Sequence, residues 1–389
     1  MPVALSIVAF LAATAVSLAT SYLLVTRLER IGARLGLSEA LLGVVAALAA
    51  NAPEITSSVT ALTSHQQKIG AGVIIGSNVF NLAALLGLGG VVAGRIALHR
   101  RVVALNGAVG IWIAVICLIT MLGAVPPAAG LVLVLAVLVP YLVVLGLGHV
   151  RLARLPFARR WESWLATAVT EEEQELTEVI HPRQGRLRDV ALAGAALVVV
   201  VAASVTMERS AAGLGTRFGV PQIVTGGIVL AAVTSLPNAV AAVYLAGRGR
   251  GAAMLSTTLN SNALNVAAGL LVPAVFTGLG APSPHSDLIT IWYLGLTLAA
   301  LAFAYRHGGV SRATGAFIIG MYLVFVGSLL ATDRAADPGY RLTVIPLIVA
   351  AVACLLALVR RPAVAPPGSR RARDDAAAAG DRAASARDR

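Results

Sequence analysis

One acidic side chain lies deep inside a long apolar segment of the chain. Glu54 lies fifteen residues after Glu39, in a stretch with no other charge, and it directly follows Pro53. A charged group at such depth costs about 2.5–3.5 kcal/mol on membrane-insertion scales, so a functional role is its default explanation. The alternative is a protonated glutamate that makes a structural hydrogen bond between helices. The polar neighbours favour function, because they bring more oxygen atoms to the same place: Asn51, Thr56, Ser57 and Ser58.

The same pattern occurs again 184 residues later. Pro53 matches Pro237, and each proline is followed 24 residues later by Ser-Asn-x-x-Asn. A proline inside a helix removes a backbone donor and frees carbonyl groups one turn earlier. Such loosened backbone at membrane depth is tolerated where it is buried in protein or lines a cavity. The two repeats together predict one set of site residues: Asn51, Glu54, Ser77, Asn81, Thr234, Ser235, Asn238, Ser261 and Asn265.

The atoms that this set presents are nearly all oxygens. Hard cations such as Ca²⁺ and Na⁺ bind through oxygen ligands. The serine and the second asparagine of each motif are four residues apart, so they share one helix face. A single Ser or Asn here is more often a packing contact between helices, but the duplicated set predicts a cation site. No cofactor is expected. Cys117 and Cys354 lie in apolar segments, which argues against a disulfide framework or a metal knuckle.

The elements that must position these residues are membrane-spanning helices. Of the 389 residues, 58% are hydrophobic and 12% charged, whereas a soluble domain carries about a quarter charged residues. The apolar runs are continuous and long enough to cross roughly 30 Å of hydrocarbon as helices, and they lack the alternation of barrel strands. The sequence predicts an all-α polytopic membrane protein whose main partner is the lipid bilayer. The expected spans are 3–26, 39–64, 69–94, 102–123, 126–148, 190–207, 219–246, 251–277, 288–305, 313–331 and 342–359.

The repeat also determines the expected architecture. Five spans separate equivalent helices, and an odd number inverts the second copy in the membrane. In secondary transporters, inverted repeats place the substrate site near the midplane, between broken helices. We expect an inverted 5+5 repeat with an extra C-terminal helix. The boundaries are 1–150 and 189–335 for the two halves, 151–188 for a cytoplasmic linker, 336–360 for the extra helix and 361–389 for a disordered tail.

Basic residues predict the orientation. Numbered in order, the odd loops hold 17 Lys and Arg, the even loops hold 5 and the tail holds 8. Because basic loops stay in the cytoplasm, we expect the N-terminus outside and the C-terminus inside, in the plasma membrane. The net charge of +12 then reflects topology rather than nucleic-acid binding. Within the linker, a Trp-containing segment at 159–164 fits an interfacial helix. The acidic run at 171–178 fits a solvated helix face better than a regulatory cation site.

Two signature motifs resemble a known family. Ala-Pro-Glu at 52–54 and Gly-Ser-Asn-Val-Phe-Asn at 76–81 closely resemble the first signature repeat of prokaryotic-type sodium/calcium exchangers, in the Ca²⁺/cation antiporter superfamily. Thr-Ser-Leu-Pro at 234–237 and Ser-Asn at 261–262 resemble the second. The resemblance covers roughly residues 1–335. It implies that the acid after the proline binds the transported ion and that hydroxyl and amide groups complete the site: Glu54, Ser77, Asn81, Thr234, Ser235, Ser261 and Asn265.

The chain departs from the family pattern at positions that matter for charge. Ala49-Ala50-Asn51 stands where the family has Gly-Thr-Ser, and Asn260 stands where the second motif has Gly. Asn238 stands where the family has its second acid. One carboxylate would leave a divalent ion under-neutralised in a low-dielectric cavity, which is expensive. The resemblance therefore implies cation exchange more strongly than it implies Ca²⁺.

The expected function is secondary-active cation antiport of the sodium/calcium exchanger type, by alternating access around a midplane oxygen site. The leading pair is Ca²⁺ against Na⁺, and H⁺ is a further candidate because a proton competes for a lone buried carboxylate. The alternatives are a monovalent cation/proton antiporter and a passive cation channel. An enzyme is not expected, since an intramembrane hydrolase would need a deep histidine as base and all six lie in loops or at span ends.

Overall fold

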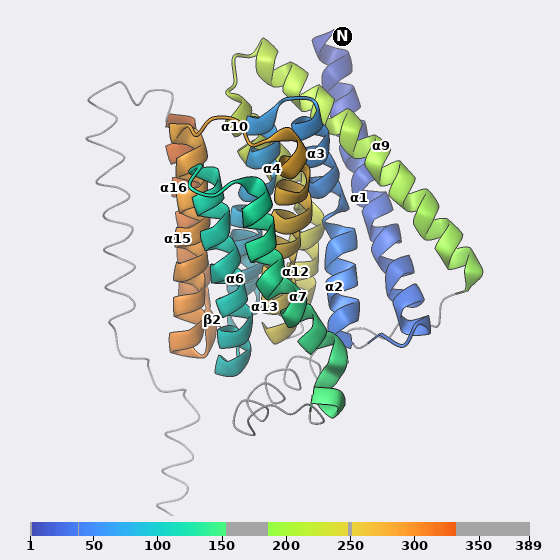
Figure 1. Ribbon diagram of the computed structural model, residues 1–389, viewed down its shortest axis with the longest axis vertical. Coiled ribbons are helices and arrows are strands. Elements are labelled where there is room, and N and C mark those ends of the chain that lie inside the picture. Colours follow the sequence, from blue (N-terminus) through green and yellow to red (C-terminus); the bar gives the residue numbers. More distant parts are fainter. Residues whose placement is uncertain (1, 38, 153–185, 248–250, 332–389) are drawn as a thin grey trace, which may run out of the picture.

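Figure 1 shows a computed structural model, which describes residues 2–37, 39–152, 186–247 and 251–331. The first half of the chain contains α1 (Val3–Arg34), α2 (Glu39–Ala50), α3 (Ala52–Thr63), α4 (Gln67–Asn81), η1 (Leu82–Leu88), α5 (Gly89–Ala93), β1 (Arg95–Ala97), α6 (Arg100–Met121) and α7 (Pro127–Leu152). The second half contains α9 (Leu187–Arg217), α10 (Gln222–Val224), η2 (Thr225–Leu230), α11 (Ala231–Thr234), α12 (Leu236–Gly247), α13 (Gly251–Leu264), η3 (Asn265–Leu271), α14 (Val272–Thr277), α15 (Pro284–His307), β2 (Gly309–Ser311) and α16 (Arg312–Ala331). The segments η1 to η3 are π-helices.

The helices are long and apolar enough to span a membrane ten times between Val3 and Ala331. Eight do so as single or continuous helices, and two bent pairs complete the set. The bent pairs are α2 with α3, at 51°, and the α10–α11 stretch with α12, at 45°. These ten spans confirm the polytopic all-α fold. The span expected at 342–359, the segments at 159–164 and 171–178, and the tail from 361 lie outside the described residues.

The two bends occur where the prolines predict them. Pro53 lies in the first turn of α3 and Pro237 in the first turn of α12, where the missing N–H has no helical partner to lose. The chain turns at the residue that links each pair of helices, which is Asn51 in the first pair and Ser235 in the second. Each bend brings the polar side chains on both sides of the proline into the interior of the bundle.

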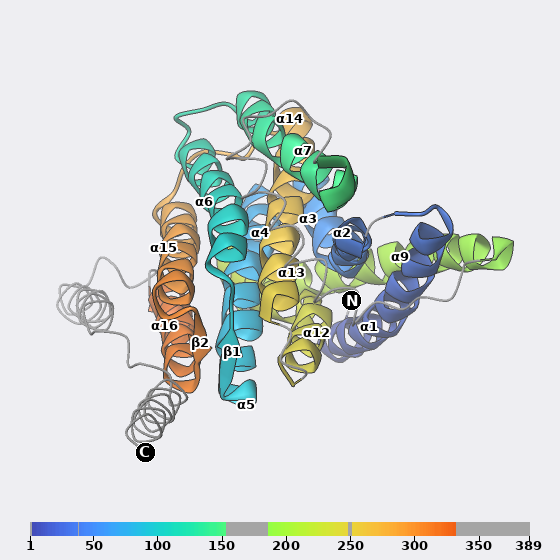
Figure 2. The same cartoon turned by 90° about the horizontal axis from the view of Figure 1, so that it is seen from below.

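The centre of the bundle is formed by α4 and α13, the two helices that carry the Ser-Asn-x-x-Asn motifs (Figure 2). A Cβ atom added at Gly76 would lie 2.2 Å from the carbonyl oxygen of Gly227. The backbones of α4 and η2 therefore touch, and glycine is required for that approach. In Figure 2, α15 and α16 lie on one side of this centre and α1 and α9 lie on the other.

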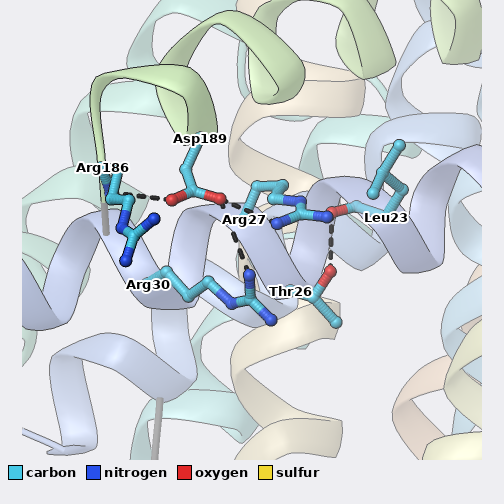
Figure 3. Close-up of polar contacts among 6 residues, drawn as sticks. All are labelled: Leu23, Thr26, Arg27, Arg30, Arg186 and Asp189. Atoms are coloured by element: carbon cyan, nitrogen blue, oxygen red, sulfur yellow. Dashed lines mark hydrogen bonds and ion pairs between the residues drawn. The ribbon is translucent and has the colours of Figure 1, made fainter. Parts of the chain in front are cut away.

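Two sets of contacts support the prediction that the odd-numbered loops lie on the same side of the membrane. β1 and β2 form a two-stranded antiparallel ladder in which Ile96 pairs with Val310, so the loops after the third and ninth spans lie on one side. At the junction of α1 and α9, Arg27 binds Asp189 at 2.8 Å and Arg30 lies 3.7 Å from it (Figure 3). Asp189 also accepts the backbone N–H of Arg186 at 2.7 Å, as expected for an acid at a helix start.

The sixth span is longer than the sequence analysis predicted. It was expected at 190–207, yet α9 continues to Arg217. Glu208 and Arg209 therefore lie within a spanning helix rather than in a loop, and Glu208 is fully buried at 0% exposure. The interpretation of Glu54 as the one ionisable side chain within a span was wrong. The charged pair Glu208-Arg209 marked the end of the predicted apolar run. A hydropathy pattern does not show which face of a helix is buried, so the burial of Glu208 was not predicted.

Candidate cation site

The predicted site residues come from four places in the bundle. The two helix bends and the two central helices, α4 and α13 with its continuation η3, supply all of them, and none is more than 2% exposed. Buried polar groups must find partners within the protein. Their hydrogen bonds therefore show which of them belong to one cluster.

The side-chain amide of Asn238 lies at the centre of the cluster. Its Nδ2 atom lies close to four oxygens: Asn51 Oδ1 at 3.1 Å, Glu54 Oε1 at 3.2 Å, Ser261 Oγ at 3.3 Å and Asn81 Oδ1 at 3.4 Å. Three amide or hydroxyl oxygens and one carboxylate oxygen thus surround one point. The Nδ2–H group at that point carries a partial positive charge. The four oxygens therefore surround it much as they would surround a cation.

Glu54 is held from the second repeat. Its Oε1 atom accepts a hydrogen bond from Ser235 Oγ at 2.9 Å as well as the one from Asn238. Its Oε2 atom is buried and has no hydrogen-bond partner among the described residues. An unpaired buried carboxylate oxygen is costly. Within the cluster, Oε2 is therefore the atom that would be stabilised most by a proton or a cation.

Two predicted residues lie next to the cluster and bond to the backbone. Ser77 Oγ donates to the carbonyl oxygen of Ala231 at 3.5 Å. Thr234 Oγ1 donates to the carbonyl of Leu230 at 2.9 Å and to that of Ala231 at 3.3 Å. Both hydroxyls therefore meet near Ala231, at the turn before the second bend. Their oxygens retain lone pairs that can face the cluster.

A symmetric network of amides joins the two central helices. Asn78 donates to the backbone carbonyl of Asn262 at 3.1 Å, and Asn262 donates to that of Asn78 at 3.1 Å. Asn265 then donates to Asn78 Oδ1, and Asn81 donates to Asn262 Oδ1, both at 3.1 Å. Asn265 is thereby joined to the site through this network and not through Glu54. Its own Oδ1 atom has no partner among the described residues.

The sequence analysis left Asn78, Asn262 and Ser58 out of the predicted site. Ser58 Oγ lies 2.9 Å from the carbonyl of Gly70 and 2.8 Å from that of Gly269, and so ties α3 to α4 and η3. The repeated Ser-Asn pair was a signal for the two asparagines, which occupy equivalent positions in both motifs. Within the described residues, no group of three or more His, Cys, Asp and Glu side chains gathers to hold a metal. Any cation here would depend on one carboxylate and neutral oxygens.

The fold and this cluster define a polytopic membrane protein in which two inverted repeats enclose a buried, singly acidic oxygen site. The family model described as sodium/calcium exchanger protein matches residues 5–147 and 189–331. The chain belongs to the sodium/calcium exchanger family. The two matched segments are the two repeats.

Comparison with solved structures shows the same fold. The sodium-calcium exchanger NCX_Mj, in a structure soaked with Na⁺ and Sr²⁺, superposes with a TM-score of 0.55 at 19% identity, over 84% of this chain and 99% of that one. The inner membrane protein YrbG of Escherichia coli is 24% identical over 73% of this chain and 84% of its own length. Sodium/potassium/calcium exchanger 1 of Gallus gallus is 26% identical over 36% of this chain, and the match spans only 22% of that exchanger.

Proposed function

We propose that this protein is a cation antiporter that works by alternating access around the Glu54 cluster. One observation carries the proposal: four oxygens from both repeats, one of them a carboxylate oxygen, converge on one buried point. Inverted repeats with broken helices at a midplane site are the architecture of secondary transporters. Membership of an exchanger family supports transport rather than enzymatic catalysis.

Each residue of the cluster has a defined part in holding a cation. Glu54 supplies the charge, and Ser235 holds one of its oxygens in place. Asn51, Asn81 and Ser261 supply neutral oxygens. Asn238 must turn its amide or withdraw it when the cation arrives, because its N–H group occupies the point on which these oxygens converge. The Asn238 side chain then competes with the transported ion for the same ligands.

The leading substrate pair is Ca²⁺ and Na⁺. The family supports this pair, and the sodium/potassium/calcium exchangers among the relatives carry these ions in their names. One feature favours a second candidate, the exchange of a monovalent cation or a proton. A single carboxylate balances one positive charge, and the second position that could carry an acid holds Asn238. A divalent ion in this site would keep an unbalanced charge in a medium of low dielectric constant.

Reconstituted vesicles distinguish the candidates. Radiolabelled Ca²⁺ and Na⁺ uptake is measured into vesicles that hold either Na⁺, a proton gradient or neither. Antiport predicts uptake only when a counter-ion is present on the other side, and the counter-ion that works identifies the pair. Uptake of either ion without any counter-ion would contradict antiport and indicate a channel.

The basic residues support an orientation with the N-terminus outside and the C-terminus in the cytoplasm of a plasma-membrane protein. The odd loops hold 17 Lys and Arg, against 5 assigned to the even loops. Single cysteines placed at Lys68 and in the 151–188 segment are labelled with an impermeant reagent in intact cells. We expect labelling at position 68 alone. Labelling of the segment instead would reverse the orientation.

A further inference from the structure

A second buried acid lies on α9, a helix that packs against α1 and α3. Glu208 on α9 is 0% exposed, and neither of its carboxylate oxygens has a hydrogen-bond partner among the described residues. Arg209, the next residue, is exposed and acts on the Glu208 carboxyl through its charge, without a hydrogen bond to it. A carboxyl group inside a spanning helix with both oxygens unpaired has no structural explanation.

Four buried serine hydroxyls on α1, α3 and α9 share this property. Ser17 and Ser21 on α1, Ser57 on α3 and Ser204 on α9 are at most 3% exposed, and no described group hydrogen-bonds to their Oγ atoms. Threonines on the same helices behave differently. Thr14, Thr206 and Thr216 each donate to the carbonyl four residues earlier, which is the ordinary arrangement for a hydroxyl in a helix. The serine hydroxyls are not used in that way.

The packing of α1 against α9 brings Ser17 to the level of Ser204. The two helices run antiparallel, with Thr14 Oγ1 3.5 Å from Met207 Sδ near one end and Arg27 bound to Asp189 at the other (Figure 3). One turn from the Thr14–Met207 contact, in the direction of Arg27, lie Ser17 on α1 and Ser204 on α9. Both belong to the buried stripes along which the helices meet.

The direction of helical side chains brings Glu208 to the same level. A long side chain in a helix points back over the residue four positions earlier, which for Glu208 is Ser204. Ser17, Ser204 and the carboxyl group of Glu208 thus lie at one buried level between α1 and α9.

We propose that this level of the α1–α9 junction is a monovalent-cation site, with Na⁺ bound by the carboxylate of Glu208 and the hydroxyl oxygens of Ser17 and Ser204. Oxygen ligands suit a hard cation, and one carboxylate neutralises one positive charge. A bound proton would neutralise the carboxyl group, but it would not explain why the buried serine hydroxyls have no hydrogen-bond partner. The site shares no ligand with the Glu54 cluster, so it stands whether or not that cluster transports.

The surroundings of the site are mostly apolar. A cavity of about 150 Å³ begins one turn further along α9, where Ala211, Phe10 of α1 and Thr225 of η2 are among its lining residues. On the outer face of the same two helices, Val16 is 44% exposed and Val198 is 68% exposed. These exposed apolar side chains indicate that the outer face of the two helices contacts lipid at the levels of Val16 and Val198.

The test measures binding and not transport. Radiolabelled Na⁺ binding to the purified full-length protein is compared for Glu54→Gln and for Glu54→Gln combined with Glu208→Gln, at an alkaline pH that keeps carboxyls ionised. We expect Glu54→Gln to retain saturable Na⁺ binding and the double variant to lose it. Ser204→Ala and Ser17→Ala, each in the Glu54→Gln background, should weaken this binding about tenfold by removing one hydroxyl ligand.

Thr206→Ala is the matched control, because its hydroxyl is exposed on the same helix and bonds only to its own backbone. It should leave Na⁺ binding unchanged. If Glu208→Gln does not fold, the two serine variants test the proposal without it. Na⁺ binding that is absent from Glu54→Gln, or that survives both serine variants and Glu208→Gln, would overturn the site. Because transport is not measured, failure here leaves the function proposed for the Glu54 cluster untouched.

Discussion

At the break between α2 and α3, Asn51 has φ −81° and ψ −1°, and at the break between α11 and α12, Ser235 has φ −87° and ψ 3°. The hydrogen bonds that cross the breaks also match. Ile55 donates to the carbonyl of Asn51 at 2.9 Å, and Ala239 donates to that of Ser235 at 3.1 Å. The two repeats therefore keep one backbone, which the proline and its neighbours determine. Their side chains differ, since the first break carries the carboxylate of Glu54 and the second carries the amide of Asn238.

The helices that face the breaks differ in what they contact. Gly76 on α4 touches the backbone of η2, whereas its equivalent Asn260 on α13 hydrogen-bonds to Ser256 and Tyr141. Both helices continue into a π-helix, with η1 beginning directly after Asn81 and η3 beginning at Asn265, but η2 has no π-helical counterpart in α2. π-helical segments are frequent at functional sites. The two repeats therefore share a backbone scaffold but differ in function. The first supplies the negative charge, and the second supplies hydrogen-bond donors.

The largest expected effect comes from removing the charge of the first repeat. Glu54→Gln should abolish exchange. Loss of a charge pair at about 4 Å costs roughly 4 kcal/mol at the effective dielectric constant of a protein, or about 1,000-fold in binding. The variant should still fold, because the glutamine oxygen can accept the hydrogen bond from Ser235. Vesicle flux and size-exclusion chromatography measure the two outcomes. Wild-type flux in a folded variant would show that the charge is not needed.

The second effect concerns the scaffold of the first repeat. In Gly76→Ala the added Cβ would meet the backbone of Gly227, which cannot move as a side chain can. Overpacking of this kind typically costs about 1–3 kcal/mol, and we expect the upper part of that range in thermal unfolding. Gly213→Ala is the control, because nothing lies within 4 Å of its added Cβ. It should gain about 0.5–1 kcal/mol from helix propensity. Equal stability of the two variants would deny the close contact between α4 and η2.

A third experiment makes the two breaks chemically alike. Asn238→Glu places a carboxylate at both equivalent positions and removes the amide from the point where the oxygens converge. We expect preference for Ca²⁺ over Na⁺ to rise by about tenfold or more, since a second charge favours the divalent ion. Competition between the two ions for uptake measures the ratio. Asn238→Gln is the control, because it keeps a neutral amide. Unchanged selectivity in Asn238→Glu would mean that position 238 only packs.

The smallest effect is the dependence on pH. A proton neutralises Glu54, and a cation binds the ionised form, so flux should fall as the pH falls. With one carboxylate the fall should follow a single protonation. In Asn238→Glu, repulsion between two carboxylates should begin the loss at a higher pH and spread it over a wider pH range, because the two protonation steps move apart. Flux is measured with equal pH on both sides, from about pH 6 to 9. A flat wild-type profile would remove the proton as a competitor.

Much of the architecture followed from residue types and their order. The length of the apolar runs predicted the ten described spans, because a helix must be long enough to cross hydrocarbon. Pro53 and Pro237 predicted the bends, since proline cannot take part in the helical hydrogen-bond ladder. The 184-residue repeat and the odd number of spans between its copies predicted inversion. Glu54 stood out because a charge is rare at that depth.

Other features depended on which groups meet in three dimensions. That Asn238 points its N–H group at the oxygens of Asn51, Glu54, Asn81 and Ser261 follows from the packing of two bends against two helices. The burial of Glu208 depends on which face of α9 lies against α1 and α3, and the charged pair at 208–209 concealed it in the sequence. Local sequence determined where helices begin, bend and end, because those events depend on backbone hydrogen bonds a few residues apart. Only the tertiary structure decided which polar atoms share a site, because most of their partners lie more than a hundred residues away.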